Sequence, residues 1–236
     1  MMILVSSIHL HVQGMCPAFP CFLKPPGLNV PDIIVPDDMI PNKATSLSST
    51  GYSVLKPFLT KQGREIDRVL GDGNCLFRAF SRAVCGVEDY HLHLRKAIAE
   101  FETDNHNLFK PIHEAVNCTK FHTHVQNIKK LYTWGTSTEI IAAATLFQVE
   151  VYVATESYRP GVPIWLQYTP KPISLLANPT NLPYLSKYNI NIQCDFHWIE
   201  LTHVSSIHFD TTKPLKGCTL SRPKLEGATT TVSSVL

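Results

Sequence analysis

A cysteine at the start of an expected helix is the side chain of this sequence best suited to covalent chemistry. Cys75 follows the turn Gly-Asp-Gly-Asn at residues 71–74 and begins a run of apolar residues with helical spacing. A thiol attacks a carbonyl carbon as its thiolate, and the positive end of a helix dipole stabilises that charge. We therefore interpret Cys75 as a candidate nucleophile. On these residues alone, a buried cysteine behind an ordinary helix cap is the alternative.

The turn before Cys75 has the residues that an oxyanion site needs. Gly73 tolerates backbone angles that other residues avoid, and either Asp72 or Asn74 could cap the helix through a side-chain oxygen. A turn of this kind can direct several backbone N–H groups at one point, where they would stabilise an oxyanion. A phosphate-binding loop is excluded, because no Gly-Lys-Ser/Thr follows the turn.

A thiol nucleophile also needs a histidine, which must be chosen among eleven. His197 lies in the run Cys-Asp-Phe-His-Trp-Ile-Glu-Leu, near the start of an expected strand. A strand holds an imidazole rigidly, and the flanking Phe196 and Trp198 could shield it from water. We interpret His197 as the candidate base for this reason. An ordinary half-buried histidine in a strand is the alternative.

The elements that would position these residues lie in the middle of the chain. Four segments carry apolar residues with helical spacing: 75–85, 92–101, 124–131 and 138–147. Three later segments have the composition of strands: 149–153, 164–168 and 196–202. Because the helices come first and the strands later, the pattern favours an α+β layer fold over a doubly wound sheet.

The two ends of the chain differ from this middle part. Prolines recur between residues 17 and 41, and proline removes a backbone donor and disfavours helix before it. We expect residues 1–54 to be a Pro/Ser-rich extension without regular structure, 55–210 to be the folded domain, and 211–236 to be a flexible tail. The apolar run at 1–12 lacks the basic segment of a signal peptide, so we expect a cytoplasmic or nuclear protein.

The composition excludes several classes of protein. The net charge is +2 with 17% charged residues and no dense basic patch, so neither nucleic acid nor a membrane is an expected partner. The seven cysteines are irregularly spaced, which indicates a reducing compartment and not a disulfide-stapled scaffold.

Residues 72–79 have the sequence Asp-Gly-Asn-Cys-Leu-Phe-Arg-Ala. This segment resembles the nucleophile motif of the OTU (ovarian tumour) family of cysteine proteases, which are deubiquitinases. The resemblance continues in order through Trp134-Gly135, Glu139-Ile140, Ala143-Ala144, the strand at 149–153 and Phe196-His197-Trp198. Ordered blocks of this kind are more specific than any one motif, and they cover about residues 60–205.

The resemblance implies a papain-like OTU fold, with a small, mostly antiparallel sheet packed between helices. It also implies the roles of the residues. Cys75 would be the nucleophile, and His197 would be the general base that activates it and then protonates the leaving amine. The backbone N–H groups of Gly73, Asn74 and Cys75 would form the oxyanion hole. No cofactor is implied, because a thiol, an imidazole and backbone donors suffice.

The residue that orients the imidazole differs among members of the family. In one subgroup it is an aspartate three residues before the cysteine, which here is Asp72. In others it is an Asp or Asn two residues after the histidine, a place that Ile199 occupies here. Ile199 cannot accept a hydrogen bond through its side chain, so we expect Asp72 to take this role. Asp195 and Glu200 are the next candidates for this role, only because they lie close to His197 in the sequence.

The expected function is a monomeric isopeptidase that removes ubiquitin or a ubiquitin-like modifier from lysine side chains. Ubiquitin or polyubiquitin chains would be its partners. Two alternatives keep the fold and change the function. One is a weak or inactive ubiquitin-binding module, and the other is an OTU-like protease that cleaves a viral or mobile-element polyprotein.

A second group of side chains has types that bind metals. It contains His113, Cys118, His122 and His124. A structural zinc site normally needs four ligands in paired spacing, which this group lacks. We therefore interpret these residues as polar groups on a surface connection and expect no metal.

Overall fold

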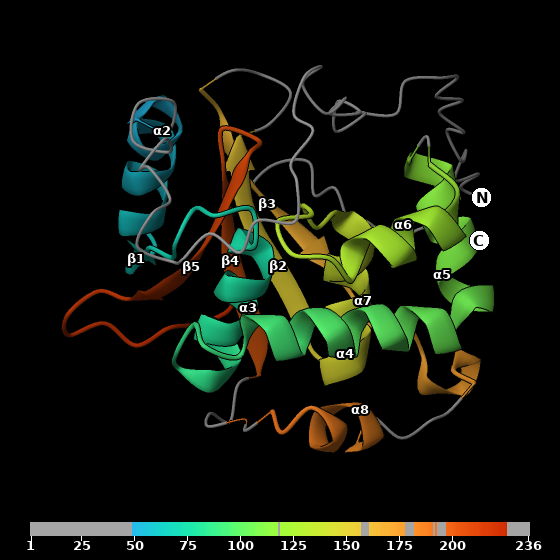
Figure 1. Ribbon diagram of the computed structural model, residues 1–236. Helices are drawn as coiled ribbons and strands as arrows, with labels where there is room; N and C mark the ends of the chain where they lie inside the picture. The colour runs from blue at the N-terminus through green and yellow to red at the C-terminus, as the bar shows by residue number, and fades with distance from the viewer. Residues whose placement is uncertain are drawn as a thin grey trace, which may run out of the picture.

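Five strands form one mixed sheet that carries helices on both faces (Figure 1). The computed structural model describes residues 49–117, 119–156, 161–177, 182–190, 192 and 197–225. The strands are β1 (Arg64–Asp67), β2 (Glu150–Glu156), β3 (Pro163–Tyr168), β4 (Trp198–Val204) and β5 (His208–Pro214). The helices are α2 (Ser49–Thr60), α3 (Cys75–Cys85), α4 (His91–Asp104), α5 (His106–Val116), α6 (Phe121–Ile128), α7 (Ser137–Phe147) and α8 (Leu182–Lys187), with a short 3-10 helix η2 (Ile173–Leu175).

The strand order is β1-β5-β4-β2-β3. Strands β2 and β4 run parallel, and the other three neighbouring pairs are antiparallel. The predicted α+β fold with a mostly antiparallel sheet between helices is thus confirmed. A parallel pair needs a long connection, and here β3, η2 and α8 all lie between β2 and β4 in the chain.

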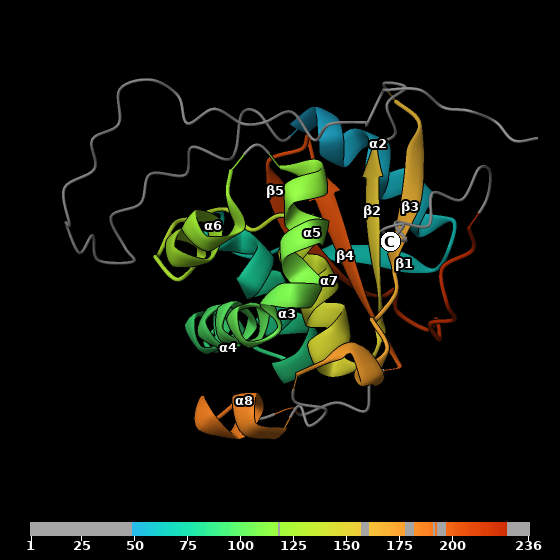
Figure 2. The ribbon, with the colours of Figure 1, turned by 90° about the vertical axis from the view of Figure 1, so that its right-hand side faces the viewer.

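The two faces of the sheet carry different layers. Successive side chains of a strand point to opposite faces. In β2, Val151 and Val153 pack in the main core with α3, α4 and α7, whereas Tyr152 and Ala154 pack with Leu55 of α2. Figure 1 shows α2 alone on its side of the sheet and α4–α7 on the other side. Helix α8 packs beneath α4, away from the sheet, in both views (Figures 1 and 2).

Local sequence signals predicted four of the helices, α3, α4, α6 and α7, but not α2, α5 or α8. The predicted helix at 75–85 is α3, and Gly86 closes it in the left-handed conformation with φ 75°. The helix predicted at 138–147 is α7, but Thr136, and not Thr138, is its cap. The Thr136 side chain accepts from the Thr138 N–H while Glu139 reaches back to the Thr136 N–H, which makes a reciprocal capping box.

Strand β5 was not foreseen, because its sequence His-Phe-Asp-Thr-Thr-Lys-Pro reads as polar. It pairs with both β4 and β1, and it runs past the expected domain end at residue 210. Helix α2 likewise begins before residue 55. Near the C-terminal end of the described residues, Arg222 forms an ion pair with Glu150 of β2 at 3.3 Å. Residues 1–48 and 226–236 lie outside the described residues.

Across the described ranges, no helix has both the length and the apolar character that crossing a bilayer requires.

Candidate active site

Cys75 is the first residue of α3, which packs against β5 and β4. Its side chain is buried, with 7% of its surface exposed. The first N–H groups of a helix have no acceptor within the helix, and they place partial positive charge at its start. The thiol therefore lies where a negative charge is stabilised, as the sequence predicts.

The imidazole that contacts Cys75 belongs to His208, the first residue of β5. Its side chain hydrogen-bonds to the Cys75 side chain. Its Nε2 lies 2.9 Å from Oδ1 of Asp210, which leaves Nδ1 as the ring nitrogen for Cys75. Residues two apart on a strand share a face, and this spacing lets His208 and Asp210 meet. The three side chains form a connected series, Cys75–His208–Asp210.

The charge of His208 follows from these two contacts. Burial by itself would lower the pKa of His208. The hydrogen bonds to Asp210 and Cys75, together with the negative charges of those groups, instead raise its pKa to about 10. The arrangement therefore favours the imidazolium form of His208 at neutral pH.

Asp210 is fully buried, and three elements supply its hydrogen bonds. Besides His208, its Oδ1 accepts from the Val69 backbone N–H at 2.9 Å. Its Oδ2 accepts from the hydroxyl of Tyr52 in α2 at 2.6 Å. Helix α2 comes close enough because Gly51 has no side chain: a Cβ there would lie 2.5 Å from the Ser205 Oγ, in the turn between β4 and β5. The carboxylate that orients His208 is thus fixed by an N-terminal helix as well as by its own strand.

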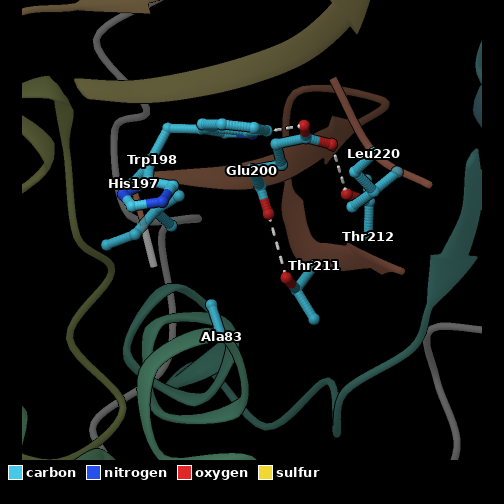
Figure 3. Close-up of a pocket in the computed structure, with 8 residues that line it drawn as sticks. Ala83, His197, Trp198, Glu200, Thr211, Thr212 and Leu220 are labelled. Carbon is cyan, nitrogen blue, oxygen red and sulfur yellow. Dashed lines mark hydrogen bonds between the residues drawn. The ribbon is translucent and has the colours of Figure 1, made fainter. Parts of the chain in front are cut away.

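His197 does not reach Cys75, so the expectation that it faces the nucleophile is wrong. It is exposed and lies just before β4, whereas His208 pairs with Val204 at the other end of that strand. Six strand steps of about 3.3 Å separate the two ends by about 20 Å. His197 instead lines a pocket with Trp198 and Glu200, above Ala83 near the end of α3 (Figure 3).

Asp72 is buried in the nucleophile turn but is not bonded to a histidine. Its Oδ1 accepts from the Asn74 N–H at 2.9 Å, and its Oδ2 accepts from Arg78 Nη2 at 2.7 Å. Burial by itself would raise the pKa of Asp72, but the hydrogen bonds from Arg78 and Asn74 lower it. Within the described part of the chain no imidazole hydrogen-bonds to this carboxylate, so the structure gives it the role of holding the turn. The predicted orienting role falls to Asp210 instead.

The turn itself is rigidly held. Gly73 has φ 84°, and a Cβ there would lie 3.2 Å from the backbone of Tyr132, so only glycine fits. The Asn74 Oδ1 accepts from Arg95 Nη2 at 2.8 Å and from the Tyr132 N–H at 3.0 Å. The Asn74 N–H is already donated to Asp72. Of the three donors expected for the oxyanion, the N–H groups of Gly73 and Cys75 therefore stay candidates.

Asp195 and Glu200, the other candidates for the residue that orients the imidazole, differ in what the structure shows of them. Asp195 lies outside the described residues. Glu200 is buried on the α2 side of β4, where both its oxygens accept from Arg64 at 2.7 Å. Trp198 and Thr212 donate to the same carboxylate, as Figure 3 shows, and among the described residues none of these hydrogen bonds involves Cys75. Glu200 is thus part of a structural ion pair.

The sequence contains a signal for the pair of residues that the structure places beside Cys75. His208-Phe209-Asp210 has an aspartate two residues after a histidine, the spacing that the resemblance gives for other members of the family. It was missed because the segment lies in a polar strand that reads as a tail. The aromatic neighbours of His197 drew attention to a more apolar strand.

Comparison with known proteins gives the family of the segment that contains Cys75. The sequence model of a family described as OTU-like cysteine protease matches residues 70–189. The match includes Cys75 and its turn and ends before β4 and β5, so neither His197 nor His208 lies within it.

Two relatives can be compared directly. The ovarian tumor domain-containing deubiquitinating enzyme 11 of Arabidopsis thaliana is 31% identical over 85 residues, which are 36% of this chain and 33% of that protein. The chain thus spans about a third of that relative's length. The structure of the OTUD1 OTU domain superposes with a TM-score of 0.54 at 17% identity, over 72% of this chain and 99% of that chain.

Proposed function

This chain belongs to the OTU-like cysteine protease family, and on that premise we propose that it is a deubiquitinase. It cleaves the isopeptide bond between the carboxyl end of ubiquitin and a lysine side chain. The observation that carries the proposal is the connected series Cys75–His208–Asp210 at the start of α3. The relative from Arabidopsis thaliana is itself named a deubiquitinating enzyme.

The geometry supports a two-step hydrolysis. The Cys75 thiolate attacks the isopeptide carbonyl carbon, and the oxygen of the tetrahedral intermediate takes the negative charge. N–H groups of Gly73 and Cys75 are the candidate donors to that oxygen. His208 gives its proton to the lysine amine as the C–N bond breaks, which leaves a thioester on Cys75. His208 then takes a proton from water, whose oxygen attacks the thioester and frees the ubiquitin carboxylate and the thiol.

Asp210 positions the base in this scheme. Its bond to Nε2 directs Nδ1 at the thiol, and its negative charge stabilises the imidazolium. The raised pKa of His208 means that the ring holds the proton that the leaving amine needs. The chemistry requires no further group.

An apolar surface beside the nucleophile turn supports a protein substrate. Leu131, Tyr132 and Trp134 are each between 42% and 49% exposed. The Tyr132 N–H donates to Asn74, the neighbour of Cys75, which ties this loop to the site. We propose that ubiquitin or a polyubiquitin chain contacts this loop. A reducing compartment, the cytoplasm or the nucleus, suits an enzyme with a thiol nucleophile.

The test is a ubiquitin probe that carries an electrophile at its carboxyl end. We expect the full chain to form a covalent adduct that Cys75→Ala abolishes. The matched pair His208→Gln and His197→Gln separates the two histidines, because only the first should slow adduct formation strongly. Folded protein that forms no adduct would overturn the proposal in favour of a binding module. An adduct that depends on His197 would overturn the assignment of the base.

A further inference from the structure

Three buried ionisable side chains meet between helices α4, α6 and α7, away from Cys75. They are Glu102 of α4, His124 of α6 and Glu139 of α7. Each offers a nitrogen or oxygen ligand atom, and these atoms all lie within 4.8 Å of one another. The two glutamates are 0% exposed and the histidine 8%. We refer to these residues as the helix-layer cluster.

Glu102 is the member of the cluster that lacks a partner. Neither of its carboxylate oxygens accepts a hydrogen bond from a donor in the part of the chain that the structure describes. The group beside it is the carboxyl of Glu139, and a hydrogen bond between two carboxyls needs a proton on one of them. A buried carboxylate with no compensating donor or cation is strongly unfavourable.

Glu139, in contrast, is fully engaged. Its Oε1 lies 2.5 Å from His124 Nε2, and its Oε2 accepts from the N–H and the hydroxyl of Thr136. The ring of His124 stacks on that of His113, with ring centroids 4.1 Å apart, and His113 contacts Thr138. Two of the three cluster members are thus held in place, and the third points at them with free lone pairs.

We propose that Glu102, His124 and Glu139 form a binding site for a divalent transition-metal ion, and that Zn²⁺ is the ion that suits it best. Carboxylate oxygen and imidazole nitrogen are both ordinary zinc ligands. Two carboxylates and a neutral imidazole around a divalent cation carry no net charge, which removes the cost of burying Glu102. The ion would also lie beside the Glu102 carboxylate oxygens, which accept no hydrogen bond from the described residues.

The geometry requires a small adjustment. Ligand atoms at about 2.1 Å from a tetrahedral zinc ion lie about 3.4 Å apart. All the ligand atoms lie within 4.8 Å of one another, and His124 Nε2 lies 2.5 Å from Glu139 Oε1. Side-chain rotations of about 1 Å would bring the widest pair closer and open this short contact. Three protein ligands leave a fourth position for another donor.

The cluster differs from the group of metal-binding residue types that the sequence suggested. The sequence pattern indicated that His124, with His122 and Cys118, is a polar group on a surface connection, but His124 is buried in α6. His122 is exposed on the outer side of α6, and Cys118 lies outside the described residues. The glutamates that meet His124 come from other helices, so spacing along the chain could not reveal them.

An ion at this place would brace the layer that supports the nucleophile. Helix α4 also carries Arg95, which donates to Asn74 in the turn before Cys75. The loop from α6 to α7 carries Tyr132, which donates to the same Asn74 oxygen. A metal ion that links α4, α6 and α7 would therefore keep Arg95 and Tyr132 at hydrogen-bonding distance from Asn74. Metal binding by the helix-layer cluster does not depend on the proposed activity.

The test is metal binding by the full chain in a Cys75→Ala background, so that zinc cannot bind the nucleophile. We expect calorimetric titration with Zn²⁺ to show one tight site per chain. Glu102→Gln should weaken that site by at least about tenfold, because it removes a ligand charge. The matched control is His122→Gln, which changes an exposed histidine on the same helix and should leave the affinity unchanged.

A second measurement needs no change in the cluster. Co²⁺ added to the same folded Cys75→Ala protein should give the visible absorption of a four-coordinate cobalt site, and Zn²⁺ should displace it. Folded protein that binds neither ion would overturn the proposal and leave Glu102 as a protonated carboxyl beside Glu139. Equal Zn²⁺ affinity in the parent and in Glu102→Gln would overturn it as well.

Discussion

The two ends of strand β4 each bring a histidine near a buried carboxylate, but the carboxylates differ in their partners. At the start of the strand, Glu200 is paired through both oxygens with the guanidinium of Arg64. At the far end, Asp210 accepts from neutral donors, the Tyr52 hydroxyl and the Val69 N–H, besides His208. The positive charge of a guanidinium offsets the negative charge of the carboxylate paired with it, so that carboxylate stabilises a nearby imidazolium only weakly. A carboxylate held by neutral donors keeps its charge available to one.

The largest expected effect separates the two histidines in activity. His208→Gln should lower kcat/KM for a ubiquitin substrate by at least about 10³-fold, because the base is lost. His197→Gln should stay within about twofold of wild type, because that ring lies at the other end of β4. Hydrolysis of a fluorogenic ubiquitin conjugate measures both. A large loss in His197→Gln with wild-type thermal stability would break the comparison.

The second effect is on stability at the start of β4. Glu200→Gln should lower the free energy of unfolding by about 3 kcal/mol, because it leaves the buried Arg64 guanidinium without its countercharge. Urea unfolding measures the change. The kcat of the remaining folded protein should stay near the wild-type value. A fall in kcat comparable to that of His208→Gln would show that this network belongs to the catalytic site.

The third expected effect is a pH dependence of stability that His208 contributes and His197 does not. The pKa of His208 is raised to about 10, from about 6.5 in an unfolded chain. Its contribution to stability is therefore complete below pH 6.5 and is lost as the pH rises towards 10. The difference in unfolding free energy between wild type and His208→Gln should shrink over that window. His197→Gln should follow wild type throughout. A difference that stays constant with pH would contradict the raised pKa.

The smallest expected effect tests the contact from α2 to Asp210. Tyr52→Phe removes one hydrogen bond and should cost about 1 kcal/mol of stability. Tyr184→Phe is the matched control, since its hydroxyl donates to Asp104 at 2.8 Å, far from the site. Both variants should lose similar stability, but only Tyr52→Phe should shift the pH profile of kcat/KM. Identical profiles would make Tyr52 a purely structural residue.

Local features of the sequence were sufficient for much of the fold. The apolar spacing of residues 75–85 and the glycine that follows predicted α3 with its observed bounds. The alternation at 149–153 predicted β2, which extends to Glu156. Strand β5 could not be found this way, because it buries polar side chains where apolar ones would be expected. Asp210 and Thr211 are buried and form hydrogen bonds, so the strand shows no alternation of apolar and polar residues.

The candidate nucleophile follows from the sequence itself, whereas the tertiary structure decided which side chains it contacts. Cys75 is defined by neighbours in the chain, namely the turn before it and the helix that it begins. Which histidine meets it depends on the direction and register of β4 and β5, which place Val204 opposite His208 beside the start of α3. His197 lies only eleven residues earlier, yet an extended strand carries it about 20 Å away. Strand pairing is a contact between distant segments, so no local pattern could choose between the two rings.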